Sequence, residues 1–137
     1  MRRSFLMITF ALAALVGCGS DEYVRVRGSF TKGGKAVFAD EAKDQWLQVT
    51  LIALGPDGKS IINAYGANVA DNGGFDVPGP DGTGVPRGKY RVSVALVTNK
   101  NRGNDLFKKE FSDNDSPIVR DITSSTNLAI DLDKPTL

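Results

Sequence analysis

From residue 23 onward, short segments of the chain alternate between apolar and polar residues, with the period of two that is typical of half-buried β-strands. The clearest segment is 89–97, where every second residue from Tyr90 to Leu96 is apolar. No stretch shows the apolar period of a stable amphipathic helix, although 40–45 is compatible with a single helical turn. Strands are also predicted at 46–54 and 127–133, and less clearly at 23–30, 36–39, 60–69, 75–78, 106–111 and 117–123.

Strong turn sequences separate these segments. Residues 55–59 suit a tight hairpin turn, because Pro56 presets its own φ angle and Gly58 readily adopts the left-handed conformation. Residues 31–35 and 71–74 have a similar composition. Many short strands, with turns at intervals of roughly ten residues, predict an all-β fold built as one antiparallel sandwich of about seven strands.

Four segments of the chain carry a family resemblance. The most specific is Pro86-Arg87-Gly88-Lys89-Tyr90-Arg91-Val92-Ser93-Val94, in which a turn leads directly into an alternating strand. The other three are Val26-Arg27-Gly28-Ser29-Phe30, Gly34-Lys35 and Gly74-Phe75-Asp76-Val77. Together they resemble the transthyretin-like (prealbumin-like) carboxypeptidase regulatory-like domain found in many bacterial lipoproteins. The resemblance implies a Greek-key sandwich of about seven strands without catalytic residues of its own.

The chain departs from this family pattern in places. Ala36-Val37 stands where the family usually has a proline, and residues 40–45 look like an insertion. Residues 98–137 carry no motif that matches the family. The resemblance is therefore strongest over 23–97.

The first 17 residues have the features of a secretion signal. Arg2 and Arg3 form a basic start, and the apolar run at 5–16 is too short to span a bilayer. The segment Leu15-Val16-Gly17-Cys18 resembles the lipobox of bacterial lipoproteins, which implies that Cys18 is linked to diacylglycerol and becomes the new N-terminus. The alternative is an uncleaved buried helix. We predict a signal peptide at 1–17, a lipidated cysteine and tether at 18–23, and the sandwich domain at 24–134.

The predicted anchor also indicates a location. Two or three acyl chains on one cysteine hold a protein stably on a membrane, whereas a single chain holds it only marginally. We therefore expect a lipid-anchored protein of the cell membrane or outer membrane, with its domain outside the cytoplasm. Gly19 favours the outer membrane in a host that has two, since aspartate at this position is the familiar inner-membrane retention signal. The predicted partners are the membrane, through Cys18, and an unidentified envelope protein or glycan.

The residue inventory narrows the possible chemistry. The chain has no histidine and a single cysteine, Cys18, so catalytic triads and histidine-ligated zinc are excluded. Its formal net charge of +1 gives no indication of nucleic-acid binding. We expect a non-catalytic binding or structural module, and we predict no cofactor and no metal site.

Carboxylate pairs are the candidates that an enzyme would have to use. Turn formation is the simpler explanation of each pair, because aspartate side chains readily bond the backbone of tight turns. The segment 113–116 also gathers the oxygen atoms that calcium prefers, but it lacks the spaced glutamate of a calcium loop. The pairs are Asp71 with Asp76, Asp113 with Asp115, and Asp131 with Asp133.

Exposed aromatic residues would favour carbohydrate binding instead. Trp46 stands in opposite phase to the apolar residues of segment 46–54, so it is a candidate stacking platform together with Tyr65. Large aromatic side chains more often fill cores or cover strand ends. Carbohydrate binding through Trp46 and Tyr65 is therefore the alternative function.

Strand parity predicts which loops face the membrane. In an antiparallel sandwich, successive connections alternate between the two ends of the molecule. If 36–39 is a strand that crosses the sheet, the loops at 71–74, 98–104 and 124–126 face the lipid, including Lys100 and Arg102. The loops at 31–35, 55–59, 79–88 and 112–116 would then lie at the distal end.

Overall fold

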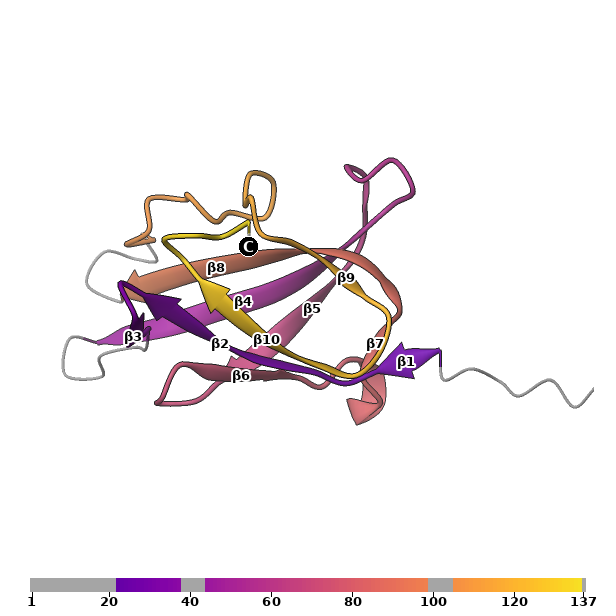
Figure 1. The fold of residues 1–137 in the computed structure, drawn as a ribbon, viewed down its shortest axis with the longest axis horizontal. Helices are drawn as coiled ribbons and strands as arrows, with labels where there is room; N and C mark the ends of the chain where they lie inside the picture. The colour runs from indigo at the N-terminus through magenta and orange to yellow at the C-terminus, as the bar shows by residue number, and fades with distance from the viewer. Residues whose placement is uncertain (1–21, 38–43, 99–104, 137) are drawn as a thin grey trace, which may run out of the picture.

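The computed structural model describes residues 22–37, 44–98 and 105–136, and its regular structure there is almost entirely β-strand (Figure 1). A three-residue 3₁₀ turn, η2 (Pro80–Gly82), is the exception within those ranges. The strands are β1 (Tyr23–Val24), β2 (Val26–Lys32), β3 (Lys35–Ala36), β4 (Gln45–Leu54), β5 (Ile61–Val69), β6 (Gly74–Val77), β7 (Val85–Pro86), β8 (Gly88–Thr98), β9 (Val119–Ile122) and β10 (Thr126–Asp131). The all-β class is confirmed.

The longer strands form one hydrogen-bonded path in the order β10-β2-β6-β5-β4-β8-β9, while β3 pairs with β2, and β1 pairs with β7. The path folds over at β5, which pairs with β4 along most of its length and with β6 only at Asn68 and Val69. In Figure 1, β2 and β10 consequently lie across β4 and β8 as a second layer. The fold is thus a β-sandwich, as the sequence predicts.

The strand order contains a Greek key. β4, β5 and β6 are consecutive in the chain and adjacent in the sheet. β2 precedes them in the chain but lies beside β6, so the connection from β2 to β4 passes from one side of this group to the other. One pairing differs from the expected antiparallel pattern: β10 runs parallel to β2, in register from Val26 with Thr126 to Thr31 with Asp131. Alternation of apolar residues cannot reveal this, because parallel and antiparallel strands have the same period of two.

The hydrophobic core lies between the two layers and follows the predicted alternation. On β8, Tyr90, Val92 and Val94 are buried. The hydroxyl of Tyr90 donates a hydrogen bond to the carbonyl oxygen of Pro86 at 2.6 Å. Burial, with a smaller contribution from nearby Tyr65, raises the pKa of Tyr90 to about 12. The other large side chains that are fully buried include Phe30, Leu51, Phe111, Ile118, Ile122 and Ile130.

One weak strand prediction is wrong. Residues 106–111 form a series of turns, in which Lys108 and Lys109 have positive φ angles of 54° and 65°. A chain with this backbone cannot stay extended, because consecutive left-handed residues reverse its direction. Phe107 and Phe111 are half-buried and buried respectively. Their apolar character, which suggested a strand, thus comes from packing against the sandwich.

The connection between β2 and β4 decides at which end of the sandwich each loop lies. Strand β3 is only two residues long and folds back on β2 as a hairpin, so it does not cross the sheet. A strand at 36–39 that crosses the sheet was the basis of the predicted parity, and its residues 38–39 lie outside the described ranges. Because β3 does not cross, the predicted end is wrong for several loops. Loops 55–60 and 78–87 lie at the same end as Tyr23, and turn 70–73 lies at the opposite end.

We call the end that holds β1, β7 and the 55–60 hairpin the tether end, and the opposite end the far end. Residues 124–126 lie at the tether end and 31–35 at the far end, as expected. Residues 112–116 run alongside the middle of β8. Lys100 and Arg102 lie outside the described residues, but Thr98, which precedes them, is at the far end opposite Gln45.

Candidate functional site

A groove of about 510 Å³ lies on the outer face of β4 and β8. Its floor consists of polar or small side chains that point away from the core, because they alternate with the buried residues of the same strands. Register places Gln48 opposite Ala95 and Thr50 opposite Ser93, so the four residues form a compact patch. The groove is therefore a mainly polar, open surface built on two long strands.

The wall of the groove is formed by residues 105–118, which are irregular in structure and precede β9. This segment runs along the edge of β8 beyond β9 and takes the place of a further strand there. The backbone N–H of Val92 donates to the Ile118 carbonyl at 2.8 Å, and that of Val94 donates to the Phe111 carbonyl at 3.0 Å. Phe111 and Ile118 are fully buried, which anchors the wall on the core.

Asp105 organises the start of this wall. Its carboxylate accepts hydrogen bonds from the backbone N–H groups of Leu96 at 3.1 Å, Phe107 at 2.9 Å and Lys109 at 2.8 Å. These bonds hold Lys108 and Lys109 in the left-handed region, which is uncommon for residues other than glycine. Asp105 thus fixes the position at which Lys109 faces the groove.

In the segment 113–116, which gathers the oxygen atoms that calcium prefers, Asp115 and Ser116 form hydrogen bonds with other protein groups. The Ser112 hydroxyl donates to the carboxylate of Asp115 at 3.0 Å. Ser116 is buried, and its hydroxyl donates to the Val92 carbonyl at 2.6 Å. Within 22–37, 44–98 and 105–136, no group of three carboxylate or thiol side chains is placed to hold a metal ion. Asp113, Asn114 and Asp115 are presented at the rim of the groove as polar contacts.

The other two carboxylate pairs lie apart from the groove. Asp76 forms an ion pair with Arg27 at 3.6 Å between two exposed side chains. Asp131 accepts the backbone N–H of Asp133 at 3.0 Å, and Asp133 accepts that of Gly33 at 2.6 Å. The carboxylates of this second pair therefore stabilise turns, which is the simpler explanation that the sequence offered.

Arg91 is a residue at this site that sequence reasoning missed. It sits on the outer face of β8 beside Ser93, and its Nη1 donates to the backbone carbonyl of Asp113 at 3.2 Å. Its Nε atom is buried and has no hydrogen-bond partner. The alternation of β8 predicts that Arg91 points away from the core, and the structure agrees. Alternation within one strand cannot predict that Asp113, from the segment after β8, lies against Arg91.

Trp46 and Tyr65 do not form a joint platform. Trp46 is half-buried and shares its strand face with Gln48 and Thr50, so it extends the floor of the groove towards the far end. Tyr65 lies opposite Leu51 on the inner face, and its ring is 6.3 Å from that of buried Tyr90. Of the two candidates, Trp46 alone belongs to the groove face.

Cys18 and the predicted signal at 1–17 lie outside the described residues. In the part of the chain that the structure describes, no helix is long and apolar enough to cross a membrane.

Comparisons with known proteins give little information about the family. No family model matches the chain, and no curated protein matches it. A leucine-rich repeat protein from Bacteroides thetaiotaomicron, whose structure is solved, is similar over 81% of this chain with 14% sequence identity and a TM-score of 0.35. The chain spans 12% of that protein's length, and a likeness at this level carries no argument about function.

Proposed function

We propose that the protein is a lipid-anchored, non-catalytic module of the bacterial cell envelope, which binds its partner at the groove on β4 and β8. The observation that carries this proposal is the position of the lipobox-like segment Leu15-Val16-Gly17-Cys18. Only Gly19 to Asp21 separate Cys18 from the described sandwich, so the segment stands where an anchor would hold a folded domain at a membrane surface.

The resemblance to transthyretin-like carboxypeptidase regulatory-like domains belongs to the same proposal. The most specific part of that resemblance, the segment from Pro86 to Val94, makes the turn after β7 and the first half of β8. Its Tyr90 bonds Pro86 and fills the core. The segment that carries the resemblance therefore has a structural role in this chain, which supports a non-catalytic module.

The groove chemistry also supports binding over catalysis. The Asp105 carboxylate is bonded by three backbone N–H groups, and Asp115 is bonded by Ser112. General acid-base chemistry requires a carboxyl group that can reach a substrate and exchange a proton with it. The groove offers polar groups of both charge signs, including Lys109 and the exposed Asp113, which suits recognition of a polar ligand or protein surface.

Replacing Cys18 with alanine is expected to abolish lipid attachment completely, because the thioether needs the cysteine sulfur. Metabolic labelling with a fatty-acid probe measures this directly in the expressing bacterium. The wild-type chain should carry the label in the membrane fraction, and the Cys18→Ala chain should carry none. Label that persists on Cys18→Ala would refute the lipoprotein assignment.

Carbohydrate binding is the second candidate, and the placement of Trp46 favours it. Trp46 adjoins Gln48 and Thr50 on the groove face, so an aromatic ring lies next to hydrogen-bonding side chains. Sugars are commonly bound by such a combination of stacking and polar contacts. Tyr65 faces the other side of the sheet and would not contact a sugar bound in the groove.

Trp46 is the single tryptophan of the chain, so its fluorescence reports on the groove face alone. If the groove binds glycans, soluble fragments of cell-wall glycan should change this fluorescence saturably. Calorimetry should show that Trp46→Ala loses binding, whereas the control variant Tyr65→Phe keeps it. Equal binding by Trp46→Ala and the wild-type chain would exclude a tryptophan platform.

A further inference from the structure

We propose that the tether end of the sandwich rests on the lipid bilayer itself, with the β5 residues Ile61 and Ile62, and Tyr23 of β1 at the same end, in contact with the membrane interface. The proposal rests on the lipid anchor proposed above, and it adds a defined docking surface and orientation. The occupant of this surface is a phospholipid bilayer.

Among the described residues, three of the five large hydrophobic side chains that are exposed lie at the tether end, and the other two are Leu106 and Val119. Ile62 is 67% exposed, Ile61 is 50% exposed and Tyr23 is 42% exposed. Ile61 and Ile62 are the first residues of β5, directly after the 55–60 turn, and two adjacent isoleucines with this exposure are unusual on a protein surface. Burial in an apolar environment would be favourable for each of them.

The shape of the hairpin explains why both isoleucines are exposed. Consecutive strand residues point to opposite faces, so one of any such pair is normally covered by the core. Here the β4–β5 hairpin extends beyond the body of the sandwich, as Figure 1 shows, and Ile61 pairs only with Leu54. Both faces of the strand are therefore free at this point.

The turn that carries these residues is firmly held. The Asp57 carboxylate accepts hydrogen bonds from the Ser60 hydroxyl and from the backbone N–H groups of Lys59 at 2.9 Å and Ser60 at 2.8 Å. These bonds lower the pKa of Asp57 to about 2, and the bond from the Ser60 side chain has the largest effect. The hairpin thus presents Ile61 and Ile62 in a fixed arrangement, which reduces the entropy lost on docking.

The length of chain before β1 brings this end to the membrane. Four residues lead from Cys18 to Glu22, and a fully extended chain of that length reaches at most about 14 Å. Tyr23 pairs with Pro86, so the tether joins the sandwich at the end that holds the 55–60 hairpin. A lipid on Cys18 would therefore hold Ile61 and Ile62 close to the bilayer, and the far end away from it.

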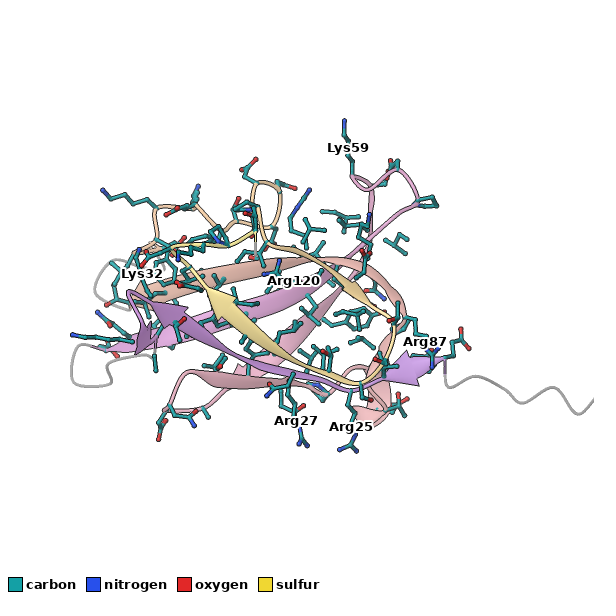
Figure 2. The ribbon with its side chains drawn as sticks, in the orientation of Figure 1. Arg25, Arg27, Lys32, Lys59, Arg87 and Arg120 are labelled. Carbon is teal, nitrogen blue, oxygen red and sulfur yellow. The ribbon has the colours of Figure 1, made fainter. Side chains whose placement is uncertain are left out.

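Charges at the tether end are balanced. Figure 2 shows Lys59 and Arg87 at this end and Lys32 at the opposite end. Exposed cations such as Arg25 and Arg87 are accompanied by exposed acids such as Glu22 and Asp81. Apolar contact, with little help from net charge, is therefore the main attraction. Docking should occur on vesicles of neutral phosphatidylcholine and should not require anionic lipid.

The test uses the full lipidated chain with an environment-sensitive fluorophore on one introduced cysteine, because Cys18 is blocked by its lipid. The test position is Ile62→Cys, and the matched control is Lys35→Cys at the far end, which is also exposed. On phosphatidylcholine vesicles, the label at 62 should shift its emission to the blue and the label at 35 should not. Adding Ile61→Ser to the Ile62→Cys chain should weaken the shift.

Three results would overturn the docking surface, and they are distinguishable from one another. If the fatty-acid probe shows lipid on Cys18 but both labels report water, the anchor stands and the docking fails. If the label at 62 shifts with protein concentration in the absence of vesicles, the patch belongs to a second copy of the chain. If Cys18 carries no lipid, the proposed function fails and removes the geometric basis of docking.

Discussion

Replacing Val92 with aspartate is expected to abolish cooperative folding of the domain. Val92 has no exposed surface and lies opposite Leu51, which is equally buried. An unpaired carboxylate at this position would cost several kcal/mol, and a domain of this size has about 5–15 kcal/mol of stability in total. Circular dichroism during chemical denaturation should show no folded baseline for Val92→Asp.

The matched control is Gln48→Asp on the neighbouring strand. Gln48 is exposed on the groove floor, so the same new charge is solvated there and should change stability by under about 1 kcal/mol. If Val92→Asp folded as well as Gln48→Asp, the assignment of the inner and outer faces of β8 would be wrong.

The second large effect is expected at Gly28 in β2. A Cβ atom there would lie 2.4 Å from the Phe75 ring and 2.5 Å from the Leu128 carbonyl oxygen. Phe75 is itself stacked on Phe30, with 5.0 Å between ring centroids, so it has little room to move. Gly28→Ala should therefore destabilise the fold by about 1–3 kcal/mol or more, as overpacked cores do.

Gly66 on β5 provides the control for this prediction. Nothing lies within 4 Å of a Cβ built at Gly66, and the residue is exposed. Gly66→Ala should leave stability unchanged or raise it slightly, since glycine in a strand is less favourable than alanine by roughly 0.5–1 kcal/mol. Denaturation midpoints of the two variants compare them directly. Equal midpoints would show that β2 and β10 do not pack as closely as described.

The strands could be predicted from sequence because one face of each is buried. Alternation at 89–97 and 46–54 anticipated the inward side chains of β8 and β4, including Val92 and Leu51. The parallel pairing of β2 with β10 could not be anticipated, since it leaves no trace in the period of either strand. The loop parity also failed, because β3 is only two residues long and folds back on β2, which the apolar pattern does not indicate.

Only some of the groove residues could be predicted from the sequence. Trp46 was recognised as out of phase with the core, and it does share the groove face. Asp105 and Arg91 were not recognised, because their roles come from contacts with Lys109 and Asp113 across an irregular segment. Such contacts have no periodicity. Composition likewise does not indicate the positive φ angles at Lys108 and Lys109, which the hydrogen bonds of Asp105 hold in place.

The mass of the intact protein extracted from bacterial membranes tests the central claim most directly. The proposed function predicts a mature chain that begins at Cys18 and carries the added mass of diacylglycerol, with or without a further acyl chain on its N-terminus. A membrane-extracted chain that retains residues 1–17, or that begins elsewhere with an unmodified Cys18, would contradict the lipid-anchored account.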